Sequence, residues 1–333
     1  MVIPKTYPKI ELHVHLDSTM RPETLLRLAH RNGYTLPFKA VEEFAAYCRP
    51  TNFHDLGRIW FETTGVLQQE QDFREVLAGY AAEAASHGAV YVEAIFNPMM
   101  MWRRGTSLDA IFTGYCEGIQ EARELHGVEF RLTPDADLFG TPEEAEEIAR
   151  YAVAYRDQGV VGFGVSGPDR TFDSTLFERA SAIARAGGLG FTPHAGEFGG
   201  AGLVRTAIEA LGASRVRHGL GAIEDDGLMR EVADRGIGFD ICPISNIRVG
   251  AVSSLEEHPI RAFVAAGIRC SVSCDDPALL DTDLGRDHEA ARSLGLAPKM
   301  LYESAVRGVL CDRATRQQLV SIGGEFDWTS VTS

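Results

Sequence analysis

The feature that most constrains the fold of this chain is a regular alternation of short apolar runs with longer helical patterns. The apolar runs are rich in residues that favour β-strands, and each is short enough to form one buried strand. Eight such runs occur, at residues 9–16, 89–97, 129–137, 160–167, 189–196, 215–219, 237–245 and 268–276. Stretches that predict helices lie between them, at residues 70–87, 108–125, 142–157, 174–186, 201–211 and 224–235.

Eight strands that alternate with helices favour one (β/α)8 barrel, an α/β fold of the TIM-barrel type. We therefore expect residues 1–333 to form a single domain. A doubly wound parallel sheet shows the same alternation, so the pattern alone does not exclude it. The first gap is unusually long, and we expect extra helices at about residues 20–87, after the first strand, that cover the mouth of the barrel.

Composition and charge narrow the classes of partner. The net charge of −15 argues against a nucleic-acid partner. No stretch of about twenty apolar residues occurs, so we expect no membrane span, and the N-terminus does not have the pattern of a signal peptide. The six scattered cysteines form no CxxC pairs, which favours reduced thiols and a cytoplasmic location. They are Cys48, Cys116, Cys242, Cys270, Cys274 and Cys311.

Two histidines, His13 and His15, lie two positions apart in the first apolar run. Side chains alternate between the two faces of a strand, so both histidines point to the same side. In a barrel that side is the interior, near the C-terminal mouth where active sites are built. A single buried histidine is more simply a core residue that is hydrogen-bonded to its neighbours, but a pair at strand spacing makes that interpretation weaker.

Other polar residues follow the same rule, because they lie where predicted strands end. His194 and Glu197 follow the fifth run, His218 ends the sixth, and Asp275 and Asp276 end the eighth. The C-terminal ends of barrel strands share one rim, so we expect these side chains to meet there. The six remaining histidines lie in helical or loop stretches, and we expect most of them at the surface; they are His30, His54, His87, His126, His258 and His288.

A divalent transition metal accounts for this set of side chains. Imidazole and carboxylate groups suit zinc, and a catalytic zinc site keeps one position open for water. Zinc lowers the pKa of bound water to about 7, which makes hydroxide available at neutral pH. The ligands would be His13, His15, His194 and Asp275. Glu197 and His218 remain for proton transfer, one to donate to the substrate and the other to orient the hydroxide.

Four motifs, in this order and spacing, resemble adenosine deaminase and its relatives in the amidohydrolase superfamily. They are "ELHVHLD" (11–17), "HAGE" (194–197), "RHGLGAIED" (217–225) and "SCDDP" (273–277). The resemblance covers nearly the whole chain, including the helical insertion. It implies a metal-dependent hydrolase with one zinc ion per subunit, which removes the 6-amino group of a purine nucleoside and releases ammonia.

The resemblance also implies a role for each site residue. The zinc ligands would be His13, His15, His194 and Asp275, and the catalytic groups would be Glu197, His218 and Asp275. Glu197 would protonate purine N1, so it must carry a proton at neutral pH, while His218 and Asp275 would hold and polarise the hydroxide. The substrate contacts would come from Asp17, Gly167, Asp276 and His15. Of these, Asp276 would bind N7, the backbone of Gly167 would contact N3, and Asp17 would reach the sugar hydroxyls.

The loops that line the pocket depart from the usual pattern of the family. Ser18 and Thr19 replace a Gly-Ala pair, Pro168 follows Gly167, and residues 97–102 replace a serine-proline run. The exact substrate is therefore open: adenosine, which would give inosine, is the default, and the alternatives are aminodeoxyfutalosine, adenine or another modified adenine. Adenine-specific relatives usually carry glutamate at the position of Asp17, so Asp17 favours a ligand that has a sugar hydroxyl.

Other segments of the sequence allow more than one interpretation. A helix at 51–68 would cover the substrate through Phe53, Leu56, Trp60 and Phe61, or would simply pack in the core. The stretch from Met99 to Trp102 could form an apolar pocket wall or take an ordinary packing role. "GFGVSG" (162–167) matches a dinucleotide motif, but no helix follows it directly. A catalytically silent ligand-binding relative and a metal-dependent phosphoesterase are further alternatives.

Overall fold

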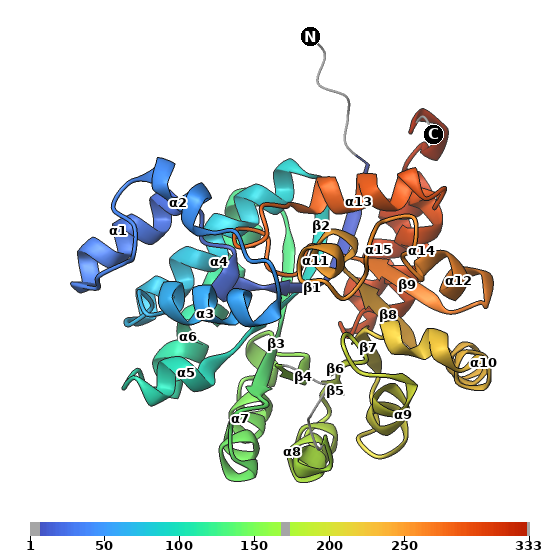
Figure 1. The fold of residues 1–333 in the computed structure, drawn as a ribbon, viewed down its shortest axis with the longest axis horizontal. Helices are drawn as coiled ribbons and strands as arrows, with labels where there is room; N and C mark the ends of the chain where they lie inside the picture. Colours follow the sequence, from blue (N-terminus) through green and yellow to red (C-terminus); the bar gives the residue numbers. More distant parts are fainter. Residues whose placement is uncertain (1–6, 168–173, 332–333) are drawn as a thin grey trace.

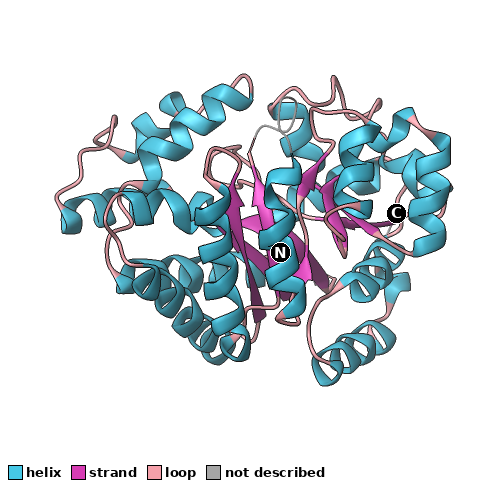
Figure 2. Cartoon of the chain, turned by 90° about the horizontal axis from the view of Figure 1, so that it is seen from below, coloured by secondary structure: helices cyan, strands magenta, loops and turns pink. Residues whose placement is uncertain are grey.

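The computed structural model describes residues 7–167 and 174–331, and its strands form a closed parallel barrel inside a ring of helices (Figures 1 and 2). Two sheets of parallel strands make up this barrel, with the orders β1-β2-β3-β4-β5 and β6-β7-β8-β9. The strands are β1 (Lys9–His15), β2 (Ala89–Phe96), β3 (Glu129–Asp137), β4 (Gly162–Ser166), β5 (Gly190–Phe191), β6 (His194–Ala195), β7 (Arg215–His218), β8 (Gly238–Ile241) and β9 (Arg269–Val272).

Backbone hydrogen bonds close the barrel between its first and last strands. The His15 N–H donates to the Asp275 carbonyl at 2.8 Å, and the Asp275 N–H donates to the His13 carbonyl at 3.1 Å. The predicted fifth strand is divided into β5 and β6 at Thr192 and Pro193, and proline has no N–H to donate to a ladder. The Thr192 N–H still reaches the Phe163 carbonyl of β4 at 2.9 Å. The predicted (β/α)8 barrel is therefore confirmed, with one of its eight strands interrupted.

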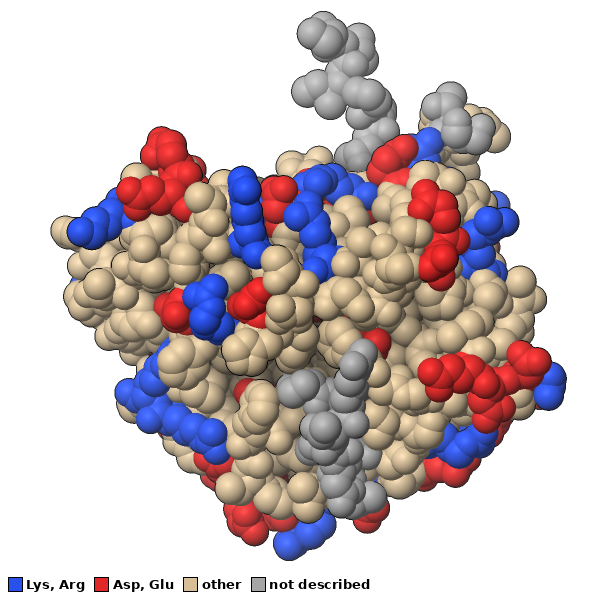
Figure 3. Space-filling view, in the orientation of Figure 1, with Lys and Arg blue, Asp and Glu red and all other residues tan. Residues whose placement is uncertain are grey.

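The helices of the outer ring alternate with the strands as predicted. They include α4 (Glu70–Ser86), α6 (Leu108–His126), α7 (Pro142–Ala154), α8 (Glu178–Ala186), α9 (Ala201–Glu209), α10 (Asp226–Arg235), α13 (Leu284–Ser293) and α14 (Pro298–Gly308). Shorter or additional helices are α5 (Pro98–Arg103), α11 (Pro243–Arg248), α12 (Ile260–Ala265) and α15 (Arg313–Glu325). No helix among the described residues combines the length and the apolarity that a membrane crossing needs. On the face drawn in Figure 3, acidic and basic side chains are interspersed.

Three helices, α1 (Pro22–Asn32), α2 (Val41–Tyr47) and α3 (Phe53–Thr64), lie between β1 and α4. α4 itself packs against α6 in the outer ring, so the helices added to the barrel span residues 22–64. Figure 1 shows α1 and α2 at the edge of the molecule and α3 nearer to the barrel. The ring of Phe53, at the start of α3, packs edge-on against Phe198 in the loop after β6, with centroids 5.2 Å apart. α3 therefore contacts the loop that carries Glu197.

Inside the barrel, below its C-terminal rim, buried arginines pair with carboxylates. Arg217, which is fully buried, donates to both oxygens of Asp135 at 2.6 and 2.7 Å, and also to the hydroxyls of Thr133 and Thr192. Gly164 in β4 leaves the space for this group, because a Cβ there would lie 2.3 Å from Asp135 Oδ1 and 2.6 Å from Arg217 Nη1. This explains a glycine of the "GFGVSG" run without any nucleotide.

Replacing Gly164 by alanine should destabilise the protein, because the added methyl group collides with a buried ion pair whose atoms are fixed by four hydrogen bonds. Overpacking of this kind costs about 1–3 kcal/mol, and chemical denaturation measures it. The matched control is Gly79→Ala in α4, where a Cβ meets no atom within 4 Å. That change should be neutral or stabilise by up to about 1 kcal/mol. Equal effects of the two substitutions would contradict the packing argument.

Candidate active site

The C-terminal ends of strands from both sheets bring three imidazoles and one carboxylate together. His13 Nε2 lies 3.1 Å from His194 Nε2, and His15 Nε2 lies 3.2 Å from the same atom. Asp275 Oδ1 lies 3.1 Å from His13 Nε2 and 3.3 Å from His15 Nε2. The structure thus brings together all four residues that the sequence predicts as metal ligands, with His13, His15 and Asp275 buried and His194 partly buried.

The hydrogen bonds around this cluster show that it fits a cation. His13 Nδ1 faces the Asp240 carbonyl at 3.4 Å, and His194 Nδ1 faces the Val165 carbonyl at 3.0 Å. Carbonyl oxygens only accept, so both Nδ1 atoms carry the protons and the two Nε2 lone pairs face each other. Burial lowers the pKa of both imidazoles to about 3. Neither of these two imidazoles therefore takes up a proton at neutral pH, and a metal ion between the lone pairs would satisfy both.

The spacing of the donor atoms also suits a small tetrahedral ion. Ligands bound about 2.0–2.1 Å from zinc at tetrahedral angles lie about 3.3–3.4 Å from one another. The four distances between donor atoms given above range from 3.1 to 3.3 Å. Histidine nitrogens and a carboxylate oxygen are a donor set that zinc accepts. The residues present therefore fit a divalent metal.

Asp275 is held by groups on three sides. Its Oδ2 accepts a hydrogen bond from the Ser245 hydroxyl at 2.6 Å, which leaves Oδ1 toward the histidines. Burial alone acts to raise the pKa of Asp275, but the facing imidazoles of His13 and His15 lower it well below its usual value. For His15 burial acts to lower the pKa, but Asp276 and Asp275 together raise it to about 9. Asp275 is therefore an anion in this environment.

His218 lies on the other side of the Asp275 carboxylate. Its Nε2 is 3.9 Å from Asp275 Oδ2 and 3.6 Å from Glu197 Oε2. Donor atoms of His13, His194, His218 and Asp275 all lie within 4.8 Å of one another, and a second group joins His15 to Asp275 and Asp276. His218 thus stands within reach of the cluster as well as of Glu197, while Asp276 stands beside His15.

The backbone at two of these residues is strained. Among the described residues, only three non-glycine residues have a positive φ, and His218 and Asp275, each at 62°, are two of them. Such a conformation costs about 1–3 kcal/mol and persists only where the surrounding structure enforces it. It turns each side chain inward at the end of its strand, which is how β7 and the segment after β9 contribute to the same site.

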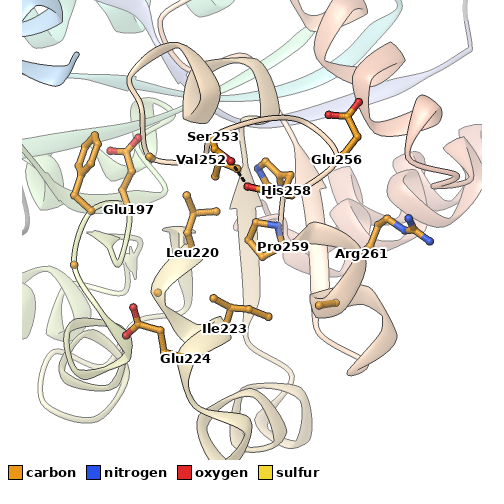
Figure 4. A pocket seen from close by; sticks show the side chains of 16 residues that line it. Glu197, Leu220, Ile223, Glu224, Val252, Ser253, Glu256, His258, Pro259 and Arg261 are labelled. Atoms are coloured by element: carbon orange, nitrogen blue, oxygen red, sulfur yellow. Dashed lines mark hydrogen bonds between the residues drawn. The ribbon is translucent and has the colours of Figure 1, made fainter. Parts of the chain in front are cut away.

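Glu197 lies at one edge of an open cavity of about 780 Å³ (Figure 4). The loops that follow β6, β7 and β8 form its walls, with Phe198, Leu220, Val252 and His258 among the lining residues. The Glu197 side chain is only 8% exposed. Its carboxylate therefore lies between the metal-binding cluster and the cavity.

Asp17 lies just after β1 and is almost completely buried. Its Oδ2 accepts a hydrogen bond from the Asn97 N–H at 3.3 Å, but its Oδ1 has no hydrogen-bond partner among the described residues. Burial raises the pKa of this carboxyl to about 6. An orphaned acceptor in a buried position suits a ligand that offers a hydroxyl group.

For Asp276 and Gly167, the other predicted substrate contacts, the structure gives burial and backbone conformation. Asp276 is 9% exposed, and burial together with Asp275 raises its pKa to about 7. Gly167 directly follows β4 and has a φ of 130°, and Pro168 lies outside the described residues. The contacts of Asp276 with N7 and of Gly167 with N3 stay predictions.

In two helices near the site, α5 and α3, some of the apolar side chains pack in the core. Met99 and Met101 of α5 are fully buried in the hydrophobic core. In α3, Leu56 is buried, while Phe61 is 49% exposed and carries the Arg104 guanidinium 4.3 Å above its ring. Phe53, at the start of α3, contacts Phe198 in the loop that carries Glu197.

Sequence reasoning missed several residues that support the site. Asp135 Oδ2 lies 3.4 Å from His194 Nδ1, and Asp135 is itself held by Arg217. Asp135 therefore helps to orient the His194 imidazole through the ring nitrogen that faces away from the cluster. The signal was present, since Arg215 and Arg217 alternate with Val216 in a strand that is otherwise apolar. His258 and His288, expected with the surface histidines, are both only 3% exposed.

Comparisons with known proteins agree with this geometry. The chain is 45% identical to an aminodeoxyfutalosine deaminase of Acidothermus cellulolyticus over 333 residues, which covers 98% of this chain and 94% of that protein. The crystal structure of an adenine deaminase from Arthrobacter aurescens superposes with a TM-score of 0.91 at 27% identity, over 96% of this chain and 99% of the other.

A zinc-bound amidohydrolase from Burkholderia ambifaria superposes with a TM-score of 0.87, also at 27% identity, over 96% of this chain and 90% of the other. Residues 8–322 match the family described as adenosine deaminase. The match spans every strand of the barrel and every residue of the metal-binding cluster. The chain therefore belongs to the adenosine deaminase family.

Proposed function

We propose that this protein is a zinc-dependent deaminase that hydrolyses the 6-amino group of aminodeoxyfutalosine, an adenine nucleoside that carries an additional group on its sugar. The observation that carries the substrate assignment is the 45% identity to an aminodeoxyfutalosine deaminase across 98% of this chain. Metal-dependent removal of an amino group from an adenine-containing compound is the broader activity that the family match supports. Adenosine, the default substrate from the sequence, stays a prediction that the substrate panel below includes.

The environment of Asp17 supports a nucleoside over the free base. Within the described ranges its buried Oδ1 has no hydrogen-bond partner, although the Trp60 side chain lies close enough to this carboxyl to lower its pKa, and a sugar hydroxyl would supply a donor. Free adenine has no hydroxyl group, so it would leave this acceptor unsatisfied. Adenine remains the second candidate, because the Arthrobacter structure is that of an adenine deaminase.

The metal ion would be held by His13, His15, His194 and Asp275. When bound, zinc supplies Lewis-acid activation of a water molecule at neutral pH. Glu197 donates a proton to purine N1, which makes C6 more electrophilic as the nucleophile adds there. His218 and the Asp275 carboxylate flank the oxygen that adds to C6. Of the two protons of the adding water, one passes by way of a carboxylate to the amino group, which leaves as ammonia, and the other restores the proton of Glu197. Asp276 and the Gly167 backbone orient the ring through N7 and N3.

A substrate panel tests the assignment. The metal-loaded protein should release ammonia from aminodeoxyfutalosine with a kcat/KM at least about 100-fold above that for adenine, because a site built for a hydroxyl strongly rejects a ligand without one. Adenosine in the same panel separates recognition of the sugar from recognition of its substituent. The Asp17→Asn variant should lose much of the preference over adenine. A higher kcat/KM for adenine than for aminodeoxyfutalosine would overturn the proposal.

Glu197→Gln tests the proton donor. The glutamine cannot give up a proton to N1, so kcat should fall about 10²–10⁴-fold, while the metal content measured by elemental analysis stays unchanged. Glu224→Gln is the matched control, because Glu224 is an exposed carboxylate on the wall of the same cavity. That variant should keep the activity of the unmodified protein. Full activity in Glu197→Gln would remove the assignment of the acid.

A pair of adjacent aspartates tests the metal ligands. Asp275→Ala removes an oxygen from the four-atom cluster, so the affinity for zinc should fall more than about 100-fold, beyond the range typical of outer partners, and turnover should be lost. Asp276→Ala should keep the metal and impair only substrate turnover. Competition with a chromophoric chelator measures both affinities. Equal zinc affinity in the two variants would contradict the proposed ligand set.

A further inference from the structure

Three buried polar side chains connect the wall of the cavity to His218. His258 lines the cavity after β8, Asn246 lies in α11, and both are almost completely buried. His258 Nε2 lies 3.2 Å from Asn246 Oδ1, and Asn246 Nδ2 lies 3.0 Å from His218 Nδ1. Figure 4 shows His258 on the cavity wall across from Glu197. The catalytic scheme above assigns no role to Asn246 or His258.

A backbone group fixes the direction of the hydrogen bonds that join His258, Asn246 and His218. The Ile260 N–H, at the first residue of α12, donates to His258 Nδ1 at 3.1 Å. A backbone N–H can only donate, so His258 Nδ1 carries no proton and the proton of this imidazole is on Nε2. His258 Nε2–H then donates to Asn246, which identifies the facing amide atom as the oxygen. The amide nitrogen of Asn246 is thereby turned toward His218.

The same logic determines the tautomer of His218. Asn246 Nδ2–H donates to His218 Nδ1, so this nitrogen also carries no proton and the imidazole proton is on Nε2. Asn246 Nδ2 also lies 3.4 Å from Glu197 Oε1. One amide group therefore contacts both residues to which the proposed function assigns the proton work. His218 Nε2, at 3.6 Å from Glu197 and 3.9 Å from Asp275, points between the two carboxylates.

We propose that Asn246 and His258 are positioning residues that hold His218 as the Nε2–H tautomer, and that His218 consequently acts as a hydrogen-bond donor toward the oxygen that adds to the ring. This inference rests on the proposed function for the role of His218, but the tautomer itself does not depend on any substrate. In this tautomer His218 Nε2 has no lone pair to accept a proton from the nucleophile. The geometry assigns to His218 the task of holding the added oxygen, and leaves proton acceptance to a carboxylate.

The direct test is the protonation of the His218 ring nitrogens in metal-loaded protein labelled with ¹⁵N-histidine and free of substrate. The expected NMR spectrum shows an unprotonated Nδ1 and a protonated Nε2 for His218, which is the pair of signals lost in His218→Gln. A protonated Nδ1 at His218 would overturn the proposal. This measurement needs no turnover, so it is independent of whether aminodeoxyfutalosine is the substrate.

Asn246→Asp reverses the direction of the hydrogen bond between residue 246 and His218 Nδ1. A carboxylate has the shape of the amide but only accepts, so it should draw the His218 proton to Nδ1 and exchange the two ¹⁵N signals. A wrong tautomer of a catalytic histidine costs up to about 10⁴-fold in kcat, and we expect a loss of at least about 100-fold with KM changed less than about threefold. Unchanged ¹⁵N signals together with an unchanged kcat would contradict the positioning role of Asn246.

Variants of His258 separate positioning from structural support. His258→Gln keeps an N–H donor for Asn246 Oδ1 and should retain kcat within about threefold, whereas His258→Phe loses the donor and should lower kcat about 10–100-fold, the range typical of outer partners. Thermal melting should show both variants folded, with KM unchanged. Ser253→Ala, on the same cavity wall, is the control and should keep full activity. Equal losses in His258→Gln and His258→Phe would contradict the positioning role.

Discussion

The structure of this site depends on imidazole lone pairs that face one another in a buried position. Backbone carbonyls fix the Nδ1 protons of His13 and His194, so their Nε2 atoms meet at 3.1 Å with the Asp275 carboxylate beside them. A cation at the centre would satisfy these donor atoms, and the surrounding barrel holds them in place. Asp135, Arg217 and Ser245 hold the ligands from behind.

Parallel strands explain why residues so distant in sequence meet. β1 and the segment after β9 join through two backbone hydrogen bonds between His15, His13 and Asp275, and these bonds both close the barrel and set the spacing of three ligands. The strained backbone at His218 and Asp275 then turns the two side chains inward. The two hydrogen bonds that close the barrel between β1 and the segment after β9 are therefore the same bonds that bring these three ligands together.

Much of this could be predicted, because strand periodicity and a common rim are local and topological rules. They placed His13, His15, His194, His218 and Asp275 together. The break at Pro193 and the start of α11 at Pro243 shortened strands that the apolar runs suggested were longer. His258 follows two glutamates in the sequence, which suggested a surface position, but tertiary packing buries it against Asn246. Contacts of that kind between loops leave no periodic trace in a sequence.

The buried pairing of Arg217 with Asp135 supports His194, whereas Asp17 and α3 lie in the segment that follows β1. The metal-binding cluster is thus supported by a buried ion pair that does not include Asp17, the residue proposed to recognise the sugar. A substitution in the segment after β1 would therefore alter the contacts proposed for the sugar and leave the buried ion pair that supports His194 intact.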